Sequence, residues 1–113
     1  MKIIPNNPPR MFKPSPSSGT TISDCGTIML TEDEMVTFGH GLGMEYDVTH
    51  KDWGFYATPS INGRLASFGW KTALVKGHDD KLYVFVVDPN KSVEFNEYLD
   101  REGHSVVEWL DER

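Results

Sequence analysis

The stretch "WGFYATPSINGRLASFGW", residues 53–70, constrains the fold more than any other part of the sequence. Two runs of β-forming residues flank Asn62-Gly63, a dipeptide preferred in type I′ turns because both residues tolerate a positive φ. Trp53, Phe55 and Ala57 alternate in the first run, and Ala66, Phe68 and Trp70 alternate in the second. The pattern predicts a β-hairpin over residues 53–70, bulged or at a sheet edge where Pro59 removes a backbone donor.

A second hairpin is predicted for "KTALVKGHDDKLYVFVVD", residues 71–88, with its turn at residues 77–80. The run 82–87 is apolar at every position, which predicts a central strand covered on both faces. Upstream, residues 27–31, 34–38 and 44–48 also read as short strands, separated by an acidic turn and by the glycine-rich loop at residues 39–43.

The C-terminal region predicts one helix over about residues 92–102, followed by a final strand at residues 105–110. Ser92 is the expected N-cap, and Gly103 suits the position just after the helix. Phe95, Tyr98 and Leu99 share one helical face. The strand before this helix, residues 82–87, and the strand after it, residues 105–110, could form a parallel β-α-β crossover through the helix. We therefore expect an α+β fold, with a mostly antiparallel, strongly curved sheet or a small, partly open β-barrel.

Residues 1–19 differ in composition from the rest and hold five of the seven prolines. Proline removes backbone donors and fixes φ, so we expect an extended or flexible N-terminal tail, with residues 20–113 forming a single α+β domain. The tail carries three basic and no acidic residues, so the other 94 residues carry −6 − 3 = −9. This acidity disfavours nucleic acid and anionic membranes as partners.

Cys25 is the only cysteine, so an internal disulfide and a multi-cysteine zinc site are both excluded. The first residues hold a basic side chain but only a short apolar run, interrupted by prolines, which does not suit a signal peptide. No apolar stretch approaches the roughly 18 residues of a membrane span. We therefore expect a cytoplasmic protein in which Cys25 is a buried or half-buried, inert thiol.

The glycine-rich loop, Gly39 to Gly43, matches neither the phosphate-binding nor the oxyanion-hole motifs. Met44 stands where a dinucleotide fingerprint needs its third glycine, and no Gly-Lys-Ser/Thr follows. An oxyanion role would need a G-x-S-x-G elbow, but Leu65 replaces the first glycine in the best match. A bulge, or a tight connection close to another strand, is the preferred interpretation. The alternative is that the protein is a small metal-dependent or acid/base enzyme that uses His40, Asp47 and His50.

Aromatic side chains around residues 53–70, with a nearby arginine, form the preferred candidate site. Flat rings beside polar groups suit sugars, peptides and protein surfaces, although a small β core would use the same residues. We expect a non-catalytic binding module without a cofactor, which recognises a small ligand, a sugar or a protein partner. The sequence is also compatible with a homo-oligomer. The candidate ligand- or partner-binding residues are Trp53, Phe55, Tyr56, Arg64 and Trp70.

Overall fold

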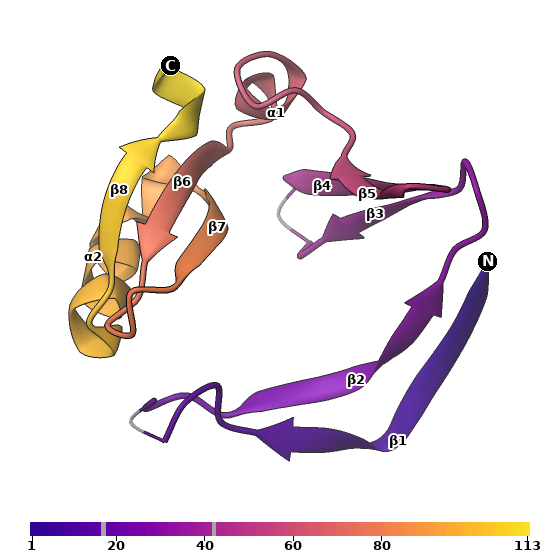
Figure 1. Ribbon diagram of the computed structural model, residues 1–113, viewed down its shortest axis with the longest axis horizontal. Helices are drawn as coiled ribbons and strands as arrows, with labels where there is room; N and C mark the ends of the chain where they lie inside the picture. The colour runs from indigo at the N-terminus through magenta and orange to yellow at the C-terminus, as the bar shows by residue number, and fades with distance from the viewer. Residues whose placement is uncertain (17, 42) are drawn as a thin grey trace. The chain divides into compact units, whose positions relative to one another are not determined.

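The structure is a computed structural model that describes residues 1–16, 18–41 and 43–113. It confirms an α+β architecture of mostly antiparallel sheets with one C-terminal helix (Figure 1). Its strands lie in three small open sheets, so the predicted barrel does not form among the described residues. The chain divides into two compact units: unit 1 is Met1–Val36 with Val48–Tyr56, and unit 2 is Thr37–Asp47 with Ala57–Arg113.

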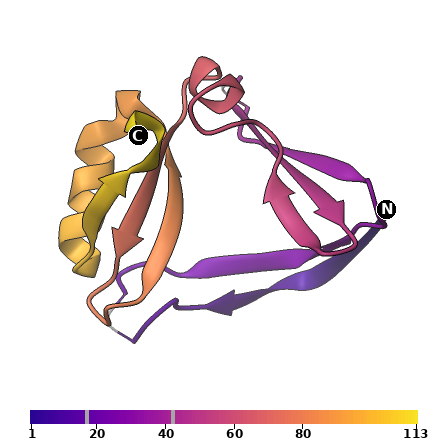
Figure 2. The ribbon, with the colours of Figure 1, turned by 45° about the horizontal axis from the view of Figure 1, so that its top comes forward.

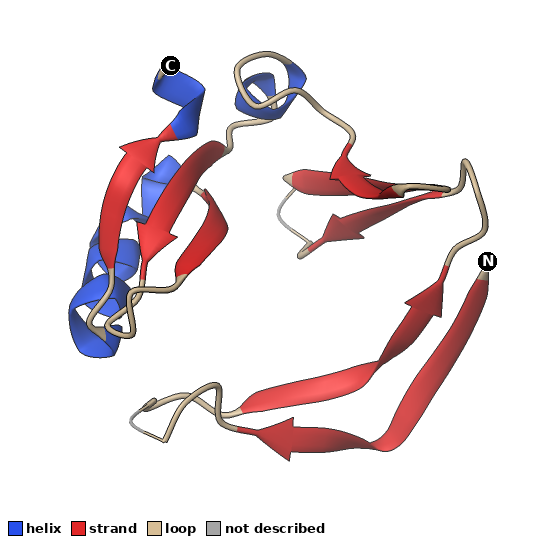
Figure 3. Cartoon of the chain, in the orientation of Figure 1, coloured by secondary structure: helices blue, strands red, loops and turns tan. Residues whose placement is uncertain are grey.

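Unit 1 contains a long two-stranded antiparallel ribbon of β1 (Lys2–Phe12) and β2 (Ile22–Met29) (Figure 3). The sequence predicted a flexible tail here, whereas the structure places residues 2–12 in a paired strand. The register is interrupted between Pro5 and Arg10, a segment that contains Pro8 and Pro9, which lack backbone donors. Cys25 on β2 is exposed, so the expected burial of its thiol is wrong. Gly26 faces Pro5 with φ +146°, and an added Cβ would lie 2.4 Å from the Ile4 carbonyl oxygen.

A second sheet has the strand order β3-β4-β5, formed by β3 (Met35–Gly39), β4 (Glu45–Lys51) and β5 (Gly54–Ala57). In unit 1, the backbone N–H of His50 donates to Glu34 O and its carbonyl accepts from Asp33 N, both at 2.9 Å. β5 is the first arm of the predicted hairpin at residues 53–70, but it belongs to the sheet of β4. The predicted hairpin is therefore wrong.

In place of the second hairpin arm, unit 2 has a short helix, α1 (Arg64–Ser67). The helix begins where the Ser60 hydroxyl accepts the Arg64 N–H and the Ser60 carbonyl accepts the Leu65 N–H. Leu65 is buried at 1% exposure. Burial of this leucine and a run of helix-forming residues outweigh the turn preference of Asn62-Gly63.

The third sheet lies in unit 2 and has the order β7-β6-β8, from β6 (Lys71–Lys76), β7 (Leu82–Val87) and β8 (Ser105–Trp109). Both outer strands are antiparallel to β6, which confirms the hairpin over residues 71–88. The prediction that residues 82–87 are central and covered is wrong, because β7 is an edge strand. β7 and β8 run parallel, but β6 lies between them.

Helix α2 (Ser92–Glu102) covers one face of this sheet (Figure 2). It follows a 3-10 turn, Pro89–Lys91, which Asp88 caps through the Asn90 N–H, so Ser92 is not the predicted N-cap. Gly103 ends the helix in the left-handed conformation, φ 69°, as predicted. The core of unit 2 consists of buried Ala73, Val75 and Leu99, against which pack Phe85, Phe95, Val106 and Trp109.

Candidate functional site

The aromatic residues of the predicted site that belong to unit 1 lie in the turn between β4 and β5 and in β5 itself. Trp53 and Tyr56 stack with centroids 5.9 Å apart and planes inclined by 27°. Phe55 lies 4.9 Å from the ring of His50. The exposed fractions of Trp53, Phe55 and Tyr56 are 69%, 64% and 42%. Trp53 and Tyr56 thus support each other at the surface, while His50 supports Phe55. We call residues Trp53–Tyr56 the aromatic segment.

An ion pair lies next to the aromatic segment. Lys51, the last residue of β4, donates to Asp33 through its ammonium group. This hydrogen bond and the charge of Asp33 raise the pKa of Lys51 above its ordinary value. The aromatic rings are thus bordered by a paired cation, which gives the surface a polar rim.

Arg64 was predicted to bind the same ligand, but in unit 2 it binds Asp47. Its Nη1 lies 3.1 Å from Asp47 Oδ2, and the Thr37 hydroxyl donates to Asp47 Oδ1 at 2.7 Å. The Asp47 carbonyl also accepts the Thr58 N–H. Asp47 is only 5% exposed, so this carboxylate anchors a turn and a helix to its strand.

Trp70 is also held by its own unit. Its indole Nε1 donates to the Glu45 carbonyl at 2.8 Å, and its ring meets His40 edge to face at 5.9 Å. This hydrogen bond orients the ring and satisfies the indole N–H, which is the only polar group of the side chain. Trp70 therefore has a structural role in unit 2, while Trp53 belongs to unit 1.

The alternative site of His40, Asp47 and His50 finds no support in the geometry. Within residues 1–16, 18–41 and 43–113, no group of three or more His, Cys, Asp and Glu side chains is arranged to hold a metal ion. Both carboxylate oxygens of Asp47 already accept hydrogen bonds from protein groups. A metal at Asp47 would have to displace Arg64 and Thr37.

The glycine-rich loop connects β3 and β4, and its residue Leu42 lies outside the described residues. Gly41 and Gly43 have φ of 84° and 87°, which favours glycine at both positions. A Cβ added at Gly39, Gly41 or Gly43 would meet nothing within 4 Å. The expected close approach to another strand is therefore wrong, and backbone conformation explains Gly41 and Gly43.

Sequence reasoning missed two exposed apolar surfaces. Unit 1 exposes the large side chains of its ribbon, among them Ile3 and Met11. Unit 2 exposes Leu82 and Val84 on β7, at 59% and 62%. The apolar residues themselves were visible in the sequence, but whether they are covered depends on the strand order.

Comparisons with protein-family models, curated proteins and solved structures gave no match to this chain. In the described part of the chain, no helix is long and apolar enough to cross a membrane. Any functional conclusion therefore depends on the geometry of the chain itself.

Proposed function

We propose that the protein is a non-catalytic binding module that holds a protein partner through the aromatic segment of unit 1. The observation that carries this proposal is the exposed stack of Trp53 on Tyr56. Phe55, from the same segment, is also exposed and lies against His50. Tryptophan and tyrosine are enriched among the residues that dominate binding energy at protein interfaces. Two rings that stack on each other are ordered before binding, which lowers the entropic cost of contact.

The rest of unit 1 favours a protein partner over a small molecule. In the described part of this unit no hydrophobic residue is buried, and several methionines are exposed by half or more, including Met11 and Met29. Exposed methionine and aromatic side chains form adaptable surfaces for protein partners. A hollow of about 220 Å³ on the ribbon, lined by Ile3, Ile4 and Ile28 among others, adds apolar surface in the same unit.

A Trp53→Ala substitution tests the proposal in the full-length chain. Because the ring is 69% exposed, its loss should lower the free energy of unfolding by far less than the roughly 3–5 kcal/mol of a buried aromatic truncation. Loss of an interface anchor costs about 2 kcal/mol or more of binding, roughly a thirtyfold weakening. Quantitative affinity capture with the tagged chain, followed by titration of the captured partner, measures this effect.

Val93→Ala is the matched control, because Val93 is 64% exposed but lies on α2 of unit 2. It should keep both the fold and the partner. Unchanged binding by the Trp53→Ala chain, with its fold intact, would contradict the proposal. So would a loss of stability as large as that of a buried tryptophan.

A further inference from the structure

Strand β7 presents an open edge with none of the usual protection against pairing. It forms one side of the order β7-β6-β8, and among the described residues only β6 pairs with it. Its sequence, "LYVFVV", contains no charged residue and no proline. Edge strands in soluble proteins usually carry charges, proline or bulges that prevent another strand from joining. An edge without them is a template for strand addition.

The other edge of the same sheet, β8, carries two of these protective features, a charge and a register shift. β8 carries Glu108, and its register with β6 shifts between Leu74 and Val75. It ends in a 3-10 turn that holds the carboxylates of Asp111 and Glu112. These features disfavour an added strand, so the two edges of one sheet are unequal.

The hydrogen-bond pattern shows which residues of β7 face outward. Gly77 N–H donates to the Lys81 carbonyl at 2.8 Å, which makes these two residues a hydrogen-bonded pair at the hairpin end. Bonded and non-bonded pairs alternate along an antiparallel ladder. The next bonded pairs are therefore Val75–Tyr83 and Ala73–Phe85. It follows that Leu82, Val84 and Val86 direct their backbone groups to the open edge.

We propose that a second copy of this chain adds to this edge, with its own β7 antiparallel to the first. For the new ladder to form, residues whose backbone N–H and C=O groups point to the open edge must lie opposite the same kind of residue in the second copy. Only the register with Val84 opposite Val84 pairs all three of them within the strand, because Leu82 then faces Val86. The two three-stranded sheets become one sheet around a twofold axis at Val84.

This register places matching side chains opposite each other on both faces of the sheet. On the helix-free face the exposed Leu82 and Val84 meet apolar residues of the second copy. On the helix face Tyr83 falls opposite Phe85, whose ring packs 6.2 Å from Phe95. Cross-strand apolar and aromatic pairs stabilise a sheet. Every pair formed between residues 82 and 86 is therefore apolar.

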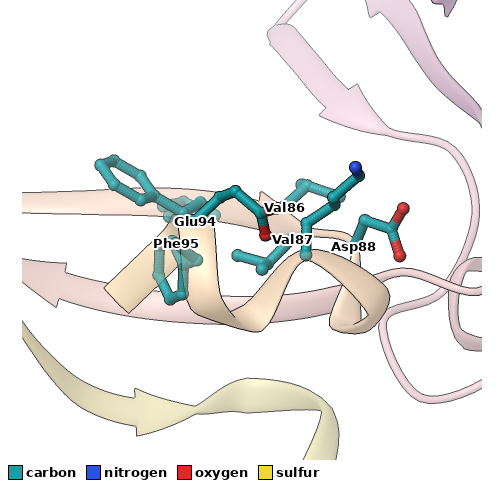
Figure 4. A pocket seen from close by; sticks show the side chains of 8 residues that line it. Val86, Val87, Asp88, Glu94 and Phe95 are labelled. Atoms are coloured by element: carbon teal, nitrogen blue, oxygen red, sulfur yellow. The ribbon is translucent and has the colours of Figure 1, made fainter. Parts of the chain in front are cut away.

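A groove beside β7 supports a second copy as the occupant. It has a volume of about 510 Å³ and lies between the strand and the start of α2, with Phe85, Phe95, Asp88 and Glu94 in its lining (Figure 4). The proposed register brings Lys81 of the second copy opposite Val87, at the end of the groove that holds Asp88. The charged residues that line the groove are Asp88, Lys91 and Glu94, two acidic and one basic, so the groove complements the positive charge of Lys81 from the second copy.

Two variants with opposite charges at position 84 test this arrangement, because the twofold axis places residue 84 of one chain directly opposite residue 84 of the other. Val84→Glu and Val84→Lys should each raise the dimer dissociation constant by about tenfold or more, since like charges then lie directly opposite. An equal mixture of the two variants should form the mixed dimer. Sedimentation equilibrium measures all three samples, and Val107→Glu on β8 is the control that should leave dimerisation unchanged.

Amide exchange of the unmodified chain gives a second test that needs no variant. At a concentration above the dimer dissociation constant the N–H groups of Leu82, Val84 and Val86 should be protected, and on dilution these three should exchange fast. Tyr83 and Phe85 should stay protected by β6 throughout. A chain that stays monomeric at all concentrations, or a dimer that both residue 84 variants leave intact, would overturn the proposal.

Discussion

Asp111 is the residue that fastens the C-terminal turn of unit 2 to β6. Its Oδ2 accepts from Lys71 Nζ at 2.9 Å, and its Oδ1 accepts the Thr72 N–H at 2.8 Å. Burial raises the pKa of this carboxyl, but hydrogen bonds from Lys71 and from backbone N–H groups bring it below its ordinary value of 3.8. The hydrogen bonds from Lys71 to Asp111 and Glu112 raise the pKa of Lys71.

Asp111→Asn should lower the free energy of unfolding by about 1–2 kcal/mol at neutral pH, because it removes the ion pair but keeps an acceptor for the Thr72 N–H. Because the pKa of Asp111 is lower in the folded state, its ionised carboxylate stabilises the fold at any pH above the ordinary pKa. This stabilisation is lost as the pH falls through the lowered, folded-state pKa. The difference between variant and parent should therefore shrink in acid. Urea denaturation at neutral and acidic pH measures it, and a pH-independent difference would contradict this account.

The sequence predicted which candidate residues lie near each other only where those residues are also close in sequence. Trp53, Phe55 and Tyr56 lie together near one turn, and sequence reasoning singled out all three. Arg64 and Trp70 were grouped with them through the hairpin, yet they bind Asp47 and the Glu45 carbonyl, residues 17 and 25 positions away. These contacts between distant residues form only in the tertiary structure, so the alternating pattern of residues 53–70 did not predict them.

At the scale of elements, the C-terminal half followed its sequence pattern closely. The hairpin of β6 and β7, helix α2 and the glycine after it all have strong local signals. A fully apolar strand predicts a central position covered on both faces, but β7 lies at the edge of its sheet. On β7, Phe85 packs against Phe95 of α2 and Val87 is buried, while Leu82 and Val84 are exposed. Strand order, which the sequence pattern does not encode, decides the difference.

The ribbon of β1 and β2 should exchange its amide protons far faster than β6. A two-stranded ribbon is marginally stable by itself, and the described residues of unit 1 bury no hydrophobic side chain. The mobility expected from the prolines is then compatible with a paired strand that opens often. Amide relaxation and hydrogen exchange of Ile3, Ile4 and Ile28, compared with Val75, measure this. Protection of the ribbon equal to that of Val75 would contradict the prediction.

For the whole molecule, the buried hydrophobic side chains of the described residues lie in one unit, whereas exposed apolar side chains occur in both. All the hydrophobic residues buried in the described chain, from Leu65 to Leu99, belong to unit 2. Unit 1 instead carries the aromatic segment and the exposed ribbon. This separation allows the proposed binding surface to change with little effect on folding, because different residues stabilise the fold.

The same separation predicts where truncation of a side chain destabilises the chain. Leu99→Ala should lower the free energy of unfolding by about 2–5 kcal/mol, because Leu99 is 8% exposed and packs with Ala73 and Val75. Ile28→Ala should cost less than about 1 kcal/mol, because Ile28 is 40% exposed on the ribbon. Urea denaturation followed by circular dichroism compares the two variants. Equal losses would mean that the ribbon is buried in solution, and the proposed apolar surface of unit 1 would then not be free to bind a partner.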